Sequence, residues 1–168
     1  LRALKLTPEM EVSIASGCAQ RDADRAAEAA EKKGIRLLPF KDSCYPGLLN
    51  QIYDPPVILY VIGKVELLSA PSVAIVGSRK CSVYGEEVST SLAYDLAQSG
   101  LCIVSGMARG IDARAHSGAL GAQGLTVAVL GTGVDVPYPR ENRKLYHEIA
   151  EKGCIISEFP IGSFPAPQ

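Results

Sequence analysis

Four short polar or glycine-bearing stretches of the sequence have the residue types that bind a phosphate group. They are Gly77-Ser78-Arg79-Lys80, residues 105–112, residues 131–135 and residues 157–160. Each follows an apolar run of strand length and leads into, or almost into, a predicted helix. Glycine lets the backbone approach a ligand closely, and the amino end of a helix presents free N–H groups to an anion. One such loop alone is ordinary turn chemistry, but several at one edge predict a site.

Basic residues cluster after the same apolar runs. Net charge is −1, with 17 basic and 18 acidic residues, so composition alone gives no electrostatic case for nucleic acid. Seven of the 17 nevertheless follow a predicted strand end, namely Arg79, Lys80, Arg109, Arg114, Arg140, Arg143 and Lys144. Arg143 and Lys144 also fit a solvated helix surface. Tyr138 and Phe159 are either faces on which bases stack or packing anchors.

A hydrolytic triad is the main catalytic alternative. Ser105, Asp112 and His116 supply the residue types of such a triad, and Asp112 and His116 are one helical turn apart. Ser105, however, is in no G-x-S-x-G elbow. Asp112 fits a helix N-cap, and His116 fits a residue that bonds this cap or a loop carbonyl. The sequence therefore favours binding over catalysis.

Several cofactor signatures are missing. The sequence has no G-x-x-x-x-G-K-[ST] loop, and Gly131-x-Gly133 lacks the third glycine of a dinucleotide fingerprint. Five cysteines form no Cys-x-x-Cys pair, which disfavours a zinc site or a disulfide framework and suits a reducing cytoplasm. No apolar run reaches membrane-spanning length. We expect no cofactor, no metal and no membrane contact.

The elements that must position these loops form a regular series. Four apolar runs, at 73–76, 102–104, 126–130 and 155–157, alternate with helical patterns that end near Gly100, Gln123 and Lys152. Strands that are apolar on both faces and separated by helices indicate a parallel sheet covered on both sides. The sequence predicts an α/β, Rossmann-like, doubly wound and mostly parallel sheet with helices on both faces, which binds ligands at the carboxyl ends of its strands.

The amino-terminal part is organised differently. It predicts a helix at 7–16, a second helix at 24–33, and strands at 35–38 and 57–62 with a proline-rich connector between them. At 168 residues, the chain suits one domain and a small appendage. We expect a helical remnant at 1–20 and an incomplete Rossmann-like DNA-binding domain at 21–168, both part of a longer protein.

The ordered motifs resemble those of the DNA-processing protein A (DprA/Smf) family. The similarity covers about residues 23–162 and includes Tyr45-Pro46, Val73 to Arg79, Ser105 to Leu120, Gly131 to Asn142 and Ile156 to Glu158. It implies sequence-independent binding of single-stranded DNA, protection of incoming strands during natural transformation, and loading of the RecA recombinase. It also implies a homodimer of the full-length protein. Family members continue into a Phe-Pro-x-Arg-Asn-Arg segment and further elements that this sequence does not contain, and the resemblance implies that the dimer and RecA contacts lie largely in that part.

The resemblance, taken with the loops, gives a set of candidate residues. Arg140 occupies a position that is commonly Lys in the family. The expected DNA- or phosphate-binding residues are Gly77, Ser78, Arg79, Lys80, Ser105, Gly106, Ala108, Arg109, Gly110, Asp112, His116, Gly131, Gly133, Arg140 and Asn142. The alternative is a nucleotide-binding enzyme such as a nucleoside monophosphate hydrolase, although Gly131-Thr132-Gly133 only faintly resembles that group's loop. A protein-interaction scaffold would leave the basic edge unexplained.

Overall fold

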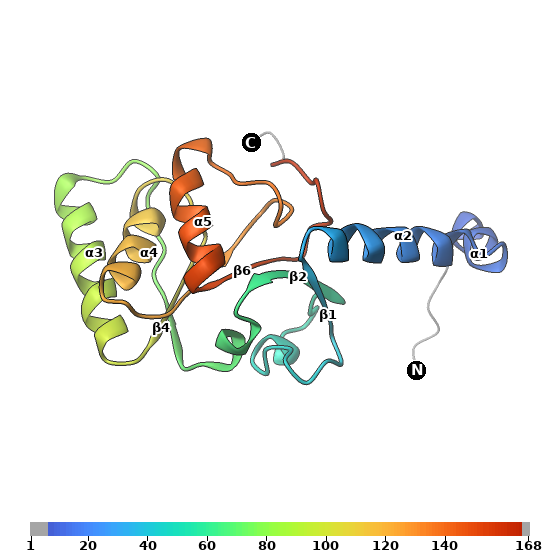
Figure 1. The fold of residues 1–168 in the computed structure, drawn as a ribbon, viewed down its shortest axis with the longest axis horizontal. Helices are drawn as coiled ribbons and strands as arrows, with labels where there is room; N and C mark the ends of the chain where they lie inside the picture. The colour runs from blue at the N-terminus through green and yellow to red at the C-terminus, as the bar shows by residue number, and fades with distance from the viewer. Residues whose placement is uncertain (1–6, 166–168) are drawn as a thin grey trace. The chain divides into compact units, whose positions relative to one another are not determined.

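The computed structural model describes residues 7–165, and contacts within it divide the chain into two compact units, Leu1–Gly34 and Ile35–Gln168. Helix α1 (Pro8–Ala15) and helix α2 (Cys18–Lys32) form the described part of the first unit (Figure 1). The division falls after Gly34, whereas the sequence placed a boundary after residue 20. Helix α2 runs without interruption through that position, because it begins at Cys18 and not at residue 24. Residues 1–6 and 166–168, the ends of the two predicted domains, lie outside the described residues.

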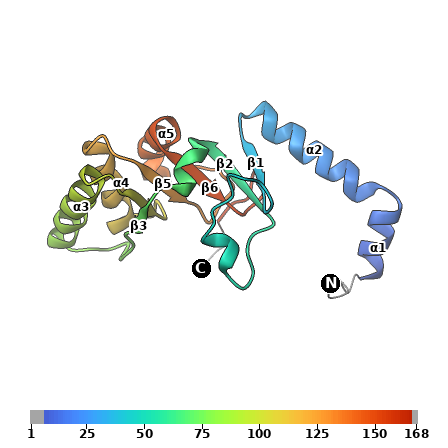
Figure 2. The same cartoon turned by 90° about the horizontal axis from the view of Figure 1, so that it is seen from below.

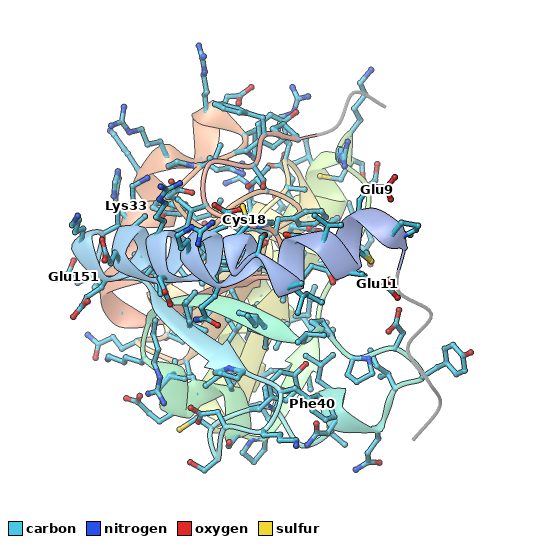
Figure 3. All side chains as sticks on the ribbon, turned by 90° about the vertical axis from the view of Figure 1, so that its right-hand side faces the viewer. Glu9, Glu11, Cys18, Lys33, Phe40 and Glu151 are labelled. Carbon is cyan, nitrogen blue, oxygen red and sulfur yellow. The ribbon has the colours of Figure 1, made fainter. Side chains whose placement is uncertain are left out.

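Local signals explain the two amino-terminal helices. The Thr7 side chain accepts a hydrogen bond from Met10 N, and Pro8 takes the first helical position, where its missing N–H costs nothing. Gly17 adopts a left-handed φ of 67°, which ends α1 and starts α2. Within residues 7–34, α1 buries no side chain and α2 buries only Ala30, and side chains such as Glu9 and Glu11 project from α1 (Figure 3).

The second unit is built on one six-stranded sheet. Its strands are β1 (Arg36–Pro39), β2 (Ile58–Gly63), β3 (Ser72–Ala74), β4 (Cys102–Ser105), β5 (Thr126–Val129) and β6 (Cys154–Ser157). Their order across the sheet is β1-β2-β6-β5-β4-β3. Strands β3, β4, β5 and β6 are mutually parallel, β2 is antiparallel to β6, and β1 is antiparallel to β2. The predicted α/β class and mostly parallel sheet are confirmed.

Three helices connect the parallel strands. They are α3 (Val83–Gln98), α4 (Ile111–Gly121) and α5 (Arg143–Lys152), and they form one layer on one face of the sheet (Figures 1 and 2). Successive parallel strands are added in one direction, so right-handed crossovers place their helices on the same side. Within residues 35–165, the other face carries no α-helix. This face carries the 3₁₀ turn η2 (Val65–Ser69). It also has a groove, which is lined in part by residues between 43 and 52, a segment that includes the 3₁₀ turn η1 (Leu49–Gln51). A doubly wound sheet also needs a point at which the order of its parallel strands reverses. Strands β3 to β6 are added in one direction, so the described part of the chain contains no such reversal.

Alternating side chains of the central strands divide the core into two clusters. Ile103 packs with small residues of α3 and α4, whereas Val127 and Ile156 pack on the opposite face with Leu67 of η2. Helix α3 packs through Ser89, Ala93 and Ala97, because small side chains let α3 and α4 approach closely. Of its apolar residues spaced four apart, Leu96 packs against the same cluster, whereas Val88 and Leu92 are exposed.

No helix within residues 7–165 is both long enough and apolar enough to span a lipid bilayer. The five cysteines are free thiols, and Cys102 and Cys154 are buried in the core.

Candidate functional site

The loops that follow the four parallel strands converge on one pocket of about 260 Å³. We call it the main pocket. Its walls are Arg79 after β3, Gly106, Ala108 and Arg109 after β4, Leu130, Gly131 and Thr132 after β5, and Tyr138, Pro139 and Pro165. The edge is therefore the one predicted for a ligand, at the carboxyl ends of parallel strands.

The predicted basic edge separates into groups. Arg79 and Arg109 line the main pocket, and Arg109 also lies 3.7 Å from the carboxylate of Glu141. Arg114 is bound to Glu86 of α3 at 2.6 Å and lines a different surface. Arg140 lines a hollow next to the main pocket. Lys80, Arg143 and Lys144 are exposed and line neither the main pocket nor this hollow.

Hydrogen bonds hold the first two loops together. Asp112 Oδ1 accepts from Gly77 N at 3.3 Å, and the carbonyl oxygen of Ser78 accepts from Ile111 N at 3.3 Å. Gly110 has a φ of 76°, and a Cβ there would run into the Ser78 carbonyl oxygen. In this structure the Gly77 amide donates to Asp112, and its contact with a phosphate stays a prediction. Asp112 is not the helix N-cap; Gly110 holds that position, and Asp112 lies in the first turn.

Asn142 holds the second loop from the other side. Its Nδ2 group donates to the carbonyl oxygens of Met107 at 2.8 Å and Ala108 at 3.3 Å. Met107 has a left-handed φ of 55° and a fully buried side chain, so its conformation needs outside support. The amide N–H groups of Asn142 thus face the protein backbone, which makes it a positioning residue for Ala108 and Arg109.

Ser105, Asp112 and His116 form no triad in the described structure. The Ser105 hydroxyl donates to the carbonyl oxygen of Ile75 at 2.6 Å, and the Asp112 carboxylate accepts from Gly77. His116 is fully buried, with Nδ1 2.7 Å from the Thr126 hydroxyl and Nε2 without a hydrogen-bond partner among the described residues. Burial lowers the pKa of His116 to about 4, and the Ser105 backbone opposes this shift only partly. The ring is neutral at pH 7 and belongs to the core beneath the loops.

The third loop has one glycine in the pocket and one outside it. Gly131 lines the main pocket, and a Cβ there would meet nothing within 4 Å. Gly133 instead packs against the loop after β6, where a Cβ would lie 2.6 Å from the Pro160 carbonyl oxygen. Tyr146 fixes this loop through a hydrogen bond from its hydroxyl to the Val134 carbonyl oxygen at 2.6 Å. Sequence reasoning missed Tyr146, although a buried ring on α5 needs a partner for its hydroxyl.

A second hollow of about 420 Å³ adjoins the main pocket, and Arg109, Tyr138, Pro139 and Pro165 line both. We call it the side pocket. Its other walls are Val136, Pro137, Arg140, Glu141 and Phe164. Of the two aromatic candidates, Tyr138 lies here, whereas Phe159 lines neither pocket. Phe164 was missed because it belongs to a closing segment with no periodic pattern.

A mostly parallel α/β sheet whose carboxyl-edge loops surround a pocket is the arrangement of the Rossmann-like folds, which as a class bind ligands at this edge. Comparison with known proteins makes this more specific. The family model described as DNA recombination-mediator protein A matches residues 36–168, and the chain belongs to that family.

Curated relatives support the same assignment. The chain is 43% identical over 142 residues to protein Smf of Synechocystis sp., covering 82% of this chain and 36% of the relative. It is 45% identical over 124 residues to the DNA processing protein DprA of Streptococcus pneumoniae, covering 74% of this chain and 44% of the relative. The chain thus spans less than half the length of these relatives.

Solved structures agree with the fold. The S. pneumoniae DprA crystal structure superposes with a TM-score of 0.75 at 42% identity, covering 79% of this chain and 46% of that one. DprA of Helicobacter pylori, which was described for its single-stranded DNA binding mode, gives a TM-score of 0.71 at 34% identity over 79% of this chain and 59% of that one. The Rossmann-like fold and the DprA/Smf resemblance are both confirmed.

Proposed function

We propose that this chain binds single-stranded DNA without sequence preference at the main pocket. The observation that carries the proposal is the convergence of loops from all four parallel strands on a pocket walled by Arg79 and Arg109. Guanidinium groups bind phosphate oxygens well because they offer several donors in one plane. The H. pylori relative, described for binding single-stranded DNA, supports the same ligand class.

The protein contacts mainly the sugar-phosphate backbone of the DNA at this site. Arg79, Arg109 and, beside them, Arg140 neutralise phosphates, and the described residues that line the two hollows form no array of side chains that reads base edges. Each neutralised phosphate on a single strand contributes about −0.7 to the slope of log affinity against log salt concentration. We expect a slope on the order of −1 to −2. We propose a binding role and no catalytic step.

Fluorescence anisotropy of a labelled oligo-dT at several salt concentrations tests the proposal. Arg79→Ala and Arg140→Ala should weaken binding and flatten the salt slope. Lys152→Ala is the matched control, because it removes one exposed positive charge at the end of α5, at the opposite edge of the sheet. AMP is added as a competitor. Binding that is insensitive to salt, or AMP binding in place of oligonucleotide binding, would overturn the proposal in favour of a mononucleotide site.

The larger role is a proposal for the whole protein. It comprises protection of incoming strands during natural transformation, loading of RecA, and assembly into a homodimer. The support is family membership, since this chain spans less than half of its curated relatives. Five free thiols suit the reducing cytoplasm in which RecA acts. RecA filament formation on DNA coated with single-strand binding protein, with and without the whole protein, tests the loading activity.

A further inference from the structure

We propose that the side pocket is a base-binding subsite, in which the base next to the phosphate held in the main pocket stacks on Tyr138 and Phe164. This inference rests on the proposed function and adds a second contact type to it. Its starting point is that two hollows share a wall of four residues, so one nucleotide of a strand can occupy both.

The lining of the side pocket suits an uncharged aromatic ring. Val136, Pro137, Pro139 and Pro165 give it apolar walls. Tyr138 and Phe164 are 46% and 79% exposed, so their ring faces are accessible to a base. Aromatic residues left exposed beside a backbone-binding groove are the usual platform of sequence-independent single-strand binders.

The charged residues that line the two hollows also differ. Glu141 lines the side pocket, and its carboxylate lies 3.7 Å from the Arg109 guanidinium that forms part of the shared wall. Arg140 also lines the side pocket, which therefore has two guanidinium groups and one carboxylate, whereas the main pocket is lined by Arg79 and Arg109 and by no acidic residue among those described. The main pocket therefore attracts a phosphate more strongly, and Arg140 can bind the next phosphate of the strand while the base in the side pocket stacks on the aromatic rings.

The volume fits as well. At about 420 Å³ the side pocket falls within the range of roughly 300–1,000 Å³ that small-ligand sites occupy. The side pocket is open to solvent, so a base of a flexible strand can enter it while the sugar and phosphate of that nucleotide stay outside the side pocket.

The test compares labelled oligo-dT with an abasic deoxyribose phosphate oligomer of the same length, by anisotropy. The chain should bind oligo-dT more tightly, by between about fivefold and about a hundredfold, the range that one aromatic stacking platform supplies. Phe164→Ala should remove most of this difference and leave affinity for the abasic oligomer and the salt slope unchanged, because Phe164 lines only the side pocket. Tyr138 lines both pockets, so Tyr138→Ala should lower affinity for oligo-dT by a larger factor than affinity for the abasic oligomer.

Two further variants sharpen the result. Tyr138→Phe keeps the ring and should keep the preference for oligo-dT, and Phe159→Ala, an exposed aromatic outside both pockets, should change neither affinity. Equal binding of both oligomers by the unmodified chain, or an equal loss for both in the alanine variants, overturns the subsite. Failure to bind either oligomer would instead contradict the proposed function. Because Phe164 is so exposed, its alanine variant should fold even if that of Tyr138 does not.

Discussion

Asp112 and Gly77 are 35 positions apart in the sequence, yet the Asp112 carboxylate accepts the hydrogen bond of the Gly77 amide at 3.3 Å. This contact joins the loop after β3 to the first turn of α4. The carboxylate also lies at the amino end of the helix, where its negative charge is favoured by the helix dipole. A residue that the sequence placed among the phosphate contacts is thus part of the frame that fixes the loops.

Replacing Asp112 with Ala should lower the free energy of unfolding by about 1–3 kcal/mol, because the Gly77 amide loses its partner. Asp112→Asn retains an acceptor oxygen and should lose less. Urea denaturation followed by circular dichroism measures both. An alanine variant as stable as the parent would show that the contact contributes nothing to the fold.

Gly110→Ala should destabilise the protein by at least about 1–3 kcal/mol, because its φ of 76° disfavours a side chain and the Cβ would strike the Ser78 carbonyl. Gly131→Ala is the matched control within the same site, since its Cβ would meet nothing within 4 Å. Thermal unfolding should separate the two variants clearly. Similar melting temperatures would contradict the geometry of the joined loops.

Asn142→Ala removes both hydrogen bonds to the Met107 and Ala108 carbonyls, and should weaken DNA binding while leaving the salt slope unchanged. This outcome distinguishes it from Arg79→Ala, which should flatten the slope. Asn142→Asp should be worse than Asn142→Ala for stability, because its carboxylate faces two carbonyl oxygens. Anisotropy at four or more salt concentrations gives both quantities, and a flatter slope for Asn142→Ala would mean that Asn142 contacts phosphate itself.

Stability should fall as pH decreases from about 6.5 to about 4. The pKa of His116 is lowered to about 4 by burial, so within this window the unfolded chain binds a proton that the folded chain does not. The shift corresponds to about 3 kcal/mol of folding stability. This stability is fully present above pH 6.5, the pKa of histidine in the unfolded chain, and is lost below about pH 4, its pKa in the folded chain. Urea midpoints at a series of pH values should show this slope.

The two histidines make the control direct. His116→Asn should flatten the slope in this window, whereas His147→Asn should keep it, because His147 is exposed on α5. A slope that survives in His116→Asn would assign the acid sensitivity to carboxylates instead.

The parallel strands and their loops were predictable because apolar runs and glycines follow simple periodic rules. The runs that end at Gly77, Gly106 and Gly131 all lie where the pattern places them, and Arg79, Arg109 and Gly131 line the pocket as the loop sequences suggest. Contacts between distant loops were not predictable, since nothing local to Asp112 or Asn142 indicates Gly77 or Met107 as a partner. Periodicity also identifies the apolar residues of α3, but it does not show that Leu96 packs against the core while Val88 and Leu92 are exposed.

The single layer of helices on the sheet has a practical consequence for experiments. Each of α3, α4 and α5 carries the chain from the carboxyl edge back to the amino edge, so the turns at Ser99-Gly100 and Gln123 lie far from the pocket loops. Ser99 and Gln123 are exposed. A dye or surface tether attached at Ser99 would leave the DNA-facing edge free, and it would let one molecule report on strands entering and leaving the opposite side.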